Sequence, residues 1–147
     1  YDTHTDQFNV NGVPIDNTLT GRLRVLNKNL VAFMEDLTDM GALKNTIVVI
    51  YSEFGRTIRE NGQQGSLANG TDHGVANNWI VLGGPIRGGV VEAPPSMAEL
   101  ADANYNALRV KLDYRLVFSN IFRHHFGITP GTLFDGQFSD RDIGLFA

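Results

Sequence analysis

Two short apolar runs, at residues 46–51 and 79–82, limit most strongly what this chain can fold into. Both are rich in apolar residues that favour strands, and turn-forming residues lie close to them, which is typical of β-strands. Each run is apolar at successive positions, so both faces of the strand are expected to be covered by other elements. The sequence therefore predicts two buried strands, the first of them parallel to its neighbour because it follows a helix. A short third strand is expected at residues 90–91.

An amphipathic helix is predicted before the first strand. Large apolar residues recur at steps of three and four between positions 19 and 37, which places one apolar stripe along a helix. Asn17 or Thr18 can cap the start of this helix, because a side-chain oxygen there accepts an otherwise unpaired backbone N–H. Gly41 stands where a helix end favours a residue in the left-handed conformation.

A second helix is predicted near the end of the sequence, from about Tyr114 to Phe126. Asp113 is its expected N-cap, and Gly127 is the expected residue just beyond its C-terminus. Residues 96–108 show a weaker helical pattern.

Helix, strand, long polar loop, strand and helix, in this order, make an α/β pattern. A chain of 147 residues is long enough for one domain. Two or three strands are nevertheless too few for an α/β sheet in which each strand has covered neighbours. We therefore expect residues 1–147 to be a single partial domain, completed by an N-terminal remainder of the same domain.

Composition excludes several classes of function. The formal net charge of −4 disfavours broad electrostatic binding to nucleic acid or to an acidic membrane surface. The chain has no cysteine, which rules out disulfides, thiolate zinc sites and cysteine nucleophiles. No apolar run approaches the ~20 residues that a membrane-spanning helix needs.

Acidic residues and histidines gather just after the predicted strands and at the start of the chain. In open parallel sheets, ligands bind beyond the carboxyl ends of the strands. Carboxylates and neutral imidazoles are the usual ligands of zinc, manganese or iron where cysteine is absent. Each motif alone is more often an ordinary turn, but three such motifs in one short chain favour a site for one or two metal ions. The candidate ligands are Asp2, His4, Glu53, Asp72 and His73.

The same motifs resemble a known family. The segments concerned are residues 1–7, 52–57, 70–74, 81–89 and 112–115. In order and spacing, they resemble the C-terminal part of the bacterial family named domain of unknown function 1501. That family is related to the alkaline phosphatase and sulfatase superfamily, whose α/β/α sandwich holds metal ions beyond the strand ends. The resemblance implies that this chain is the C-terminal part of such a sandwich, an incomplete domain.

The resemblance also implies roles for particular residues. Glu53 stands where the superfamily has the aspartate of a metal-binding Asp-His pair, but Phe54 replaces the histidine and cannot ligate a metal. His73 looks like a later histidine ligand of the superfamily, and Asp72 is either a second ligand or the residue that orients His73.

Asp2 and His4 look like the carboxylate and histidine of an earlier metal-binding loop of the superfamily. The nucleophile and the first metal-binding aspartate lie upstream of such a loop, so this chain is not expected to contain them.

The function that follows is hydrolysis of a small anionic ester, a phosphate or a sulfate, with a divalent metal as cofactor: zinc first, then manganese, calcium or iron. Arg56 is the expected catalytic residue, because its planar guanidinium matches the oxygens of such an ester. A salt bridge to Glu53 or Glu60 is the structural alternative for Arg56. Asn61 and Asn77 either orient substrate or water or simply make turns. Export to the periplasm or beyond is implied by the family alone.

Two other functions stay open at this point. One is a non-catalytic relative that keeps the fold and binds a ligand or a partner, which the presence of Phe54 favours. The other is an interaction protein in which these loops are only structural.

Overall fold

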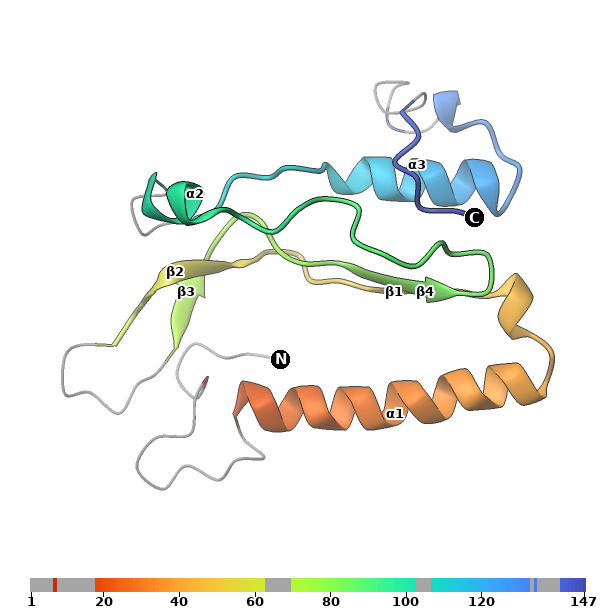
Figure 1. The fold of residues 1–147 in the computed structure, drawn as a ribbon, viewed down its shortest axis with the longest axis horizontal. Coiled ribbons are helices and arrows are strands. Elements are labelled where there is room, and N and C mark those ends of the chain that lie inside the picture. Colours follow the sequence, from red (N-terminus) through yellow and green to blue (C-terminus); the bar gives the residue numbers. More distant parts are fainter. Residues whose placement is uncertain (1–6, 8–17, 63–69, 103–106, 133, 135–140) are drawn as a thin grey trace.

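The computed structural model of this chain describes residue 7 and residues 18–62, 70–102, 107–132, 134 and 141–147 (Figure 1). It contains both helices and strands, with four successive strands between the long helix and the later helices, and the predicted α/β class is confirmed. In the described residues, no helix is long and apolar enough to cross a membrane. The elements in chain order are α1 (Leu19–Asp39), the 3₁₀ turn η2 (Leu43–Asn45), β1 (Ile47–Ile50), β2 (Arg56–Glu60), β3 (Thr71–His73), β4 (Ile80–Gly83), α2 (Met97–Asp102), α3 (Tyr114–His124) and the 3₁₀ turn η3 (Pro130–Thr132).

Helix α1 begins and ends as the sequence predicts. The hydroxyl of Thr18 accepts a hydrogen bond from the backbone N–H of Gly21 at 3.3 Å, so Thr18 is the N-cap. Gly41 follows the helix with φ +66°, the left-handed conformation that glycine adopts without a steric penalty. The apolar stripe is only partly covered, because Leu37 is buried whereas Leu23 and Phe33 remain exposed.

Helix α3 also has the predicted N-cap. The carboxylate of Asp113 accepts the backbone N–H of Arg115 at 2.9 Å and pairs with the guanidinium of the same residue at 2.7 Å. The helix ends at His124, two residues before the predicted end, and Gly127 follows in the left-handed conformation with φ +66°.

Strands β1 and β4 form a two-stranded sheet, and they run antiparallel. Ile47 lies opposite Gly83, and Ile50 lies opposite Ile80. The prediction of a parallel strand was therefore wrong. A parallel neighbour requires a crossover connection, usually a helix, whereas the chain after β1 forms the hairpin β2–β3 and returns along β1.

Two further predictions about strands are corrected. Residues Val90 and Val91 form no strand, and Val90 is 80% exposed. The strands that do form are less buried than expected, since β1 is half-buried along its length and Ile80 is 50% exposed. The weak helical pattern at 96–108 corresponds to the short helix α2, and residues 103–106 lie outside the described part of the chain.

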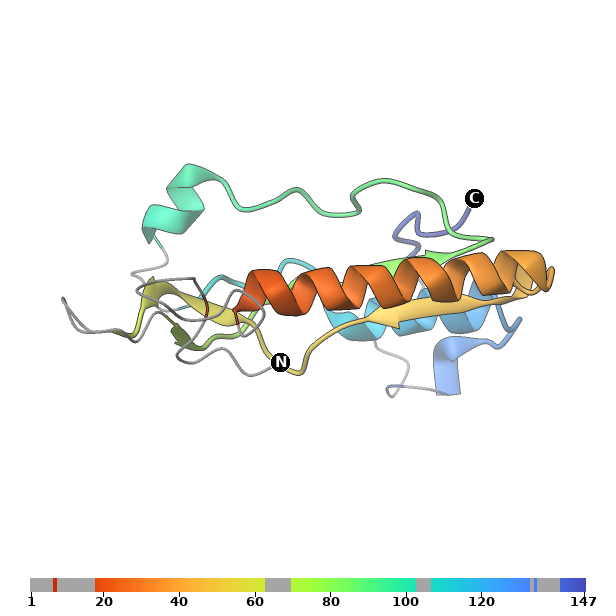
Figure 2. The same ribbon diagram turned by 90° about the horizontal axis from the view of Figure 1, so that it is seen from below.

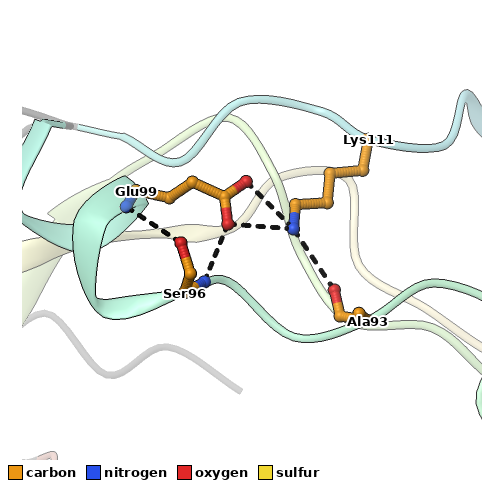
Figure 3. A network of polar contacts seen from close by, with 4 residues as sticks. All are labelled: Ala93, Ser96, Glu99 and Lys111. Atoms are coloured by element: carbon orange, nitrogen blue, oxygen red, sulfur yellow. Dashed lines mark hydrogen bonds and ion pairs between the residues drawn. The ribbon is translucent and has the colours of Figure 1, made fainter.

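Helix α2 is held by a reciprocal capping pair (Figure 3). The backbone N–H of Ser96 donates to the Glu99 carboxylate at 2.7 Å, and the N–H of Glu99 donates back to the Ser96 hydroxyl at 3.2 Å. Lys111 forms an ion pair with Glu99 at 3.0 Å and donates to the carbonyl of Ala93 at 3.4 Å. This network ties α2 to the segment that leads into α3.

The β1–β4 sheet lies between α3 on one face and α1 on the other (Figures 1 and 2). The core is on the α3 side, where Val117, Ile121 and Leu145 are buried against residues of β1 and β4. On the opposite side, a groove of about 690 Å³ lies between α1 and Leu82 of β4. The buried core of the described residues thus lies on the α3 face of the sheet, and the α1 face is more loosely covered.

Candidate functional site

The long loop predicted between the two apolar strands is a hairpin arm that projects beyond the end of β1 (Figure 1). Strands β2 and β3 pair antiparallel, with Arg56 opposite His73 and Glu60 opposite Thr71. The segments 52–57 and 70–74, which are separated in the sequence, therefore meet at the root of this arm.

Two glycines allow two segments of the backbone to approach each other closely at the root of the arm. The backbone N–H of Gly74 donates to the carbonyl of Gly55 at 2.7 Å. A Cβ atom on Gly55 would lie 1.6 Å from the carbonyl oxygen of Ala76, and one on Gly74 would lie 2.6 Å from the backbone of Arg56. The glycines in both sequence motifs are therefore required by the close approach of backbone to backbone.

Asn77 fixes the loop that follows β1. Its side-chain amide donates to the backbone carbonyls of Ser52 and Phe54, the latter at 3.3 Å. Its Oδ1 accepts the indole N–H of Trp79 at 2.8 Å. Loop 52–54 is thereby tied to the start of β4, so Asn77 positions this loop and does not merely make a turn.

The imidazole of His73 stacks on the ring of Phe54. Their centroids are 3.7 Å apart and the rings are inclined by 26°. Stacking holds the imidazole by its face, whereas a metal is bound through a nitrogen lone pair in the ring plane. Phe54 cannot ligate a metal, but its contact fixes the orientation of a residue that can.

Glu53 lies beside these rings and is exposed. The pKa of its carboxyl is below the usual value, mainly because its own backbone N–H and the Ser52 hydroxyl favour the ionised form. The Ser52 hydroxyl donates to the carboxylate at 3.1 Å. Glu53 precedes β2 and His73 ends β3, so the pairing of these strands places both predicted ligands at the root of the same arm.

Asp72 lies on the other face of the arm. Successive side chains of a strand point to opposite faces, and β3 includes both Asp72 and His73. The carboxylate of Asp72 accepts the side-chain amide of Asn61 at 3.1 Å. This arrangement favours Asp72 as a structural residue of the hairpin over a ligand that shares a metal with His73.

Asp2 and His4 lie outside the described residues. Gln7, the last residue of the same segment, is bonded to the arm. The side-chain oxygen of Gln7 accepts the hydroxyl of Thr71 at 3.2 Å. Thr71 and His73 are two positions apart on β3 and so share a face. Among the described residues, no three acidic or histidine side chains form a metal-binding group.

Arg56 has contacts within the arm that the sequence did not indicate. Its guanidinium donates to the backbone carbonyl of Thr71 at 2.8 Å and lies 5.6 Å from the centroid of the Phe54 ring. Arg56 therefore helps to hold β2 against β3 and to place Phe54. Its role toward a substrate stays a prediction.

Trp79 and Phe54 are positioning residues that the sequence did not reveal. Trp79 appeared only as the first residue of a strand, and Phe54 only as a departure from a ligand pattern. Nothing in a single sequence links an indole at position 79 to a carbonyl at position 52.

Comparison with known proteins gives one match. A family model described as "Protein of unknown function (DUF1501)" matches residues 1–145. Neither the curated proteins nor the solved structures give a match.

Proposed function

The chain belongs to the DUF1501 family, and from this membership and the site at the root of the arm we propose that the protein is a metal-dependent hydrolase of phosphate or sulfate esters. The observation that supports the proposal most is the pairing of β2 with β3, which brings the motif at residues 52–57 against the motif at residues 70–74. Glu53 and His73 come from these two separate motifs.

The proposal includes the fold of the whole domain. We place residues 1–147 in the C-terminal part of an alkaline-phosphatase-like α/β/α sandwich, whose N-terminal remainder supplies the nucleophile. A sheet between two helices supports this placement, as does the open groove of about 690 Å³ between α1 and Leu82.

The donor atoms at the site suit a divalent cation. A carboxylate oxygen and an imidazole nitrogen are ligands that zinc, manganese and iron accept. A catalytic zinc has about three protein ligands, so Glu53 and His73 need at least one more. Asp2 and His4 are the candidates, because their segment ends at Gln7, which is bonded to β3 on the His73 face.

A bound metal ion would polarise the ester and lower the pKa of the attacking group. The residues of this chain would orient and bind. Phe54 fixes His73 by stacking, and Asn77 holds the loop that bears Glu53. Arg56 is the candidate to contact the anionic oxygens, and to do so it would have to keep its bond to Thr71 through one nitrogen and use another for substrate.

The second candidate function is a non-catalytic relative of the same fold that binds a ligand or a partner. One observation favours it: Phe54 occupies a place where the superfamily has a metal ligand, and here its ring covers one face of His73. Such a protein would bind no metal at this site.

Metal content decides between the two. We would measure it by elemental analysis of the natural protein, purified without chelators or a histidine tag, and of the variant His73→Ala. We expect one or two equivalents of metal in the unaltered protein and loss of metal in the variant. His125→Ala is the matched control, because His125 caps α3 far from the arm.

Absence of metal from the unaltered protein under all loading conditions would refute the hydrolase proposal and favour the non-catalytic relative. Equal loss of metal in His73→Ala and His125→Ala would show a folding defect in place of a lost ligand. The variant Asp72→Ala extends the test, since the geometry of β3 predicts that it keeps its metal.

A further inference from the structure

Three aromatic rings form a row beside the candidate site. Tyr51 follows β1, Trp79 precedes β4 and Tyr114 begins α3. The ring centroids of Tyr51 and Trp79 are 4.8 Å apart with planes inclined by 30°, and those of Trp79 and Tyr114 are 6.0 Å apart and inclined by 28°. Trp79 is thus the middle ring of the row, and its plane is inclined to each of the other two planes by a similar angle.

Phe118 contacts all three rings of the row. This ring is edge-on to Tyr51, Trp79 and Tyr114, with interplanar angles of 86°, 76° and 86°. Edge-to-face and offset contacts are the favoured arrangements of aromatic pairs. The rings are therefore held in place before any ligand arrives.

The two ends of the row differ. Both end rings are exposed, Tyr51 at 59% and Tyr114 at 51%. At the Tyr114 end, however, the guanidinium of Arg115 lies 5.8 Å from the ring centroid. Tyr51 directly precedes Ser52 and Glu53, so it stands at the start of the loop of the candidate metal site.

The row and the site are also joined by hydrogen bonds. The indole of Trp79 donates to Asn77, and Asn77 donates to the carbonyls of Ser52 and Phe54. A ligand that contacts the row would therefore lie next to a loop whose position the same residues fix.

We propose that Tyr51 is a binding subsite for a flat ring in the alcohol part of the ester substrate. This inference rests on the proposed function and specifies its substrate class. An exposed aromatic ring that is already oriented stacks on a planar aryl group or on the apolar face of a sugar, and either would leave the ester group beside Glu53. Both ligands share one chemistry, a ring with a flat apolar face.

The test uses binding, so that it does not depend on turnover. Three phosphate monoesters would be titrated into the natural protein: phenyl phosphate, glucose 1-phosphate and methyl phosphate. Binding would be followed by fluorescence, because Trp79 is the single tryptophan of this sequence and contacts Tyr51 directly. Trp79→Phe is the control that assigns the signal to this residue.

We expect at least one ring-bearing ester to bind about 3- to 10-fold more tightly than methyl phosphate, the advantage typical of one aromatic contact. Tyr51→Leu, which keeps an apolar side chain against Trp79, should abolish this advantage. Tyr114→Leu, at the other end of the row, should retain it. Preference for phenyl phosphate alone assigns an aryl ester, and preference for glucose 1-phosphate alone assigns a sugar ester.

Equal affinity for all three esters, or an advantage that survives in Tyr51→Leu, would overturn the proposal. These outcomes are separable from failure of the proposed function. A protein that binds metal and methyl phosphate but shows no ring preference refutes the subsite alone. A protein without metal that still prefers the ring-bearing esters retains the subsite and refutes the hydrolase.

Discussion

Replacement of Asn77 by alanine is expected to release loop 52–54 from the start of β4. The change removes two donated hydrogen bonds, to the carbonyls of Ser52 and Phe54, and one accepted from Trp79. A hydrogen bond contributes about 1 kcal/mol net, and a buried donor left without a partner costs about 1–3 kcal/mol. The carbonyl of Ser52 is exposed and can bond to water instead. We therefore expect Asn77→Ala to lower the free energy of unfolding by about 2 kcal/mol.

The measurement is urea unfolding of Asn77→Ala and of Asn78→Ala, followed by circular dichroism. Asn78 is the adjacent, exposed residue, and a surface substitution of this kind changes stability by less than about 0.5 kcal/mol. Trp79 emission in the native state supplies a local readout, since the indole loses its hydrogen-bond acceptor only in Asn77→Ala. Metal content of the same variants would show whether the position of Glu53 depends on this loop.

A third variant separates the two sides of the amide. Asn77→Asp keeps an oxygen for the indole of Trp79 but loses both donated bonds and places a negative charge against two carbonyls. We expect its stability to fall as in Asn77→Ala while its tryptophan emission stays near that of the unaltered protein. Equal stability of Asn77→Ala and Asn78→Ala would refute the reasoning, because the amide would then contribute nothing to holding the loop.

Two further predictions concern the capping network of α2 and the crossing at the root of the arm. The pKa of Glu99 is lowered from 4.5 to about 2 by the backbone N–H of Ser96 first, and then by Lys111 and the Ser96 hydroxyl. The ionised Glu99 therefore contributes to stability above pH 4.5, and this contribution is lost as the pH falls through about 2. The difference in melting temperature between the unaltered protein and Glu99→Gln should shrink across this pH window. A difference that stays constant would contradict the prediction. Gly55→Ala should cost about 3 kcal/mol or more in urea unfolding, because its Cβ meets a carbonyl oxygen at 1.6 Å, whereas Gly88→Ala has open space around its Cβ and should be near neutral. Similar stabilities of these two variants would mean that the backbone at Gly55 yields without strain.

Features that depend on neighbours in sequence could be predicted. Thr18 and Asp113 cap their helices because a short polar side chain reaches a backbone N–H two or three residues ahead. Gly41 and Gly127 end their helices for an equally local reason. Such contacts involve a few residues and need no knowledge of the rest of the fold.

The pairing of β1 with β4 could not be predicted in the same way. A run that is apolar on both faces indicates only that it is covered, and it reads the same in either direction. The antiparallel pairing follows from the hairpin arm between the two strands, and the sequence of that arm is rich in the polar and turn-forming residues of an ordinary loop. The direction of β4 was thus decided by a long-range feature.

The candidate site shows the same limit. Glu53 and His73 were predicted as ligands from two separate motifs, and the arm brings these two motifs to one place. Asp72 was grouped with them because residues 70–74 were interpreted as a loop, in which adjacent side chains can face one ligand. These residues include strand β3, and the alternation of a strand separates Asp72 from His73.

The crossing of Gly55 and Gly74 has a consequence for how such chains can diverge. The two glycines are joined by one hydrogen bond, and the backbone N–H of Asn61 donates to the carbonyl of Gly70 at 3.0 Å further along the arm. The chain between positions 61 and 70 therefore begins and ends at nearly the same point. An insertion or deletion in that stretch is therefore expected to leave Glu53 and His73 in place, so we expect differences in length among relatives to fall between positions 61 and 70.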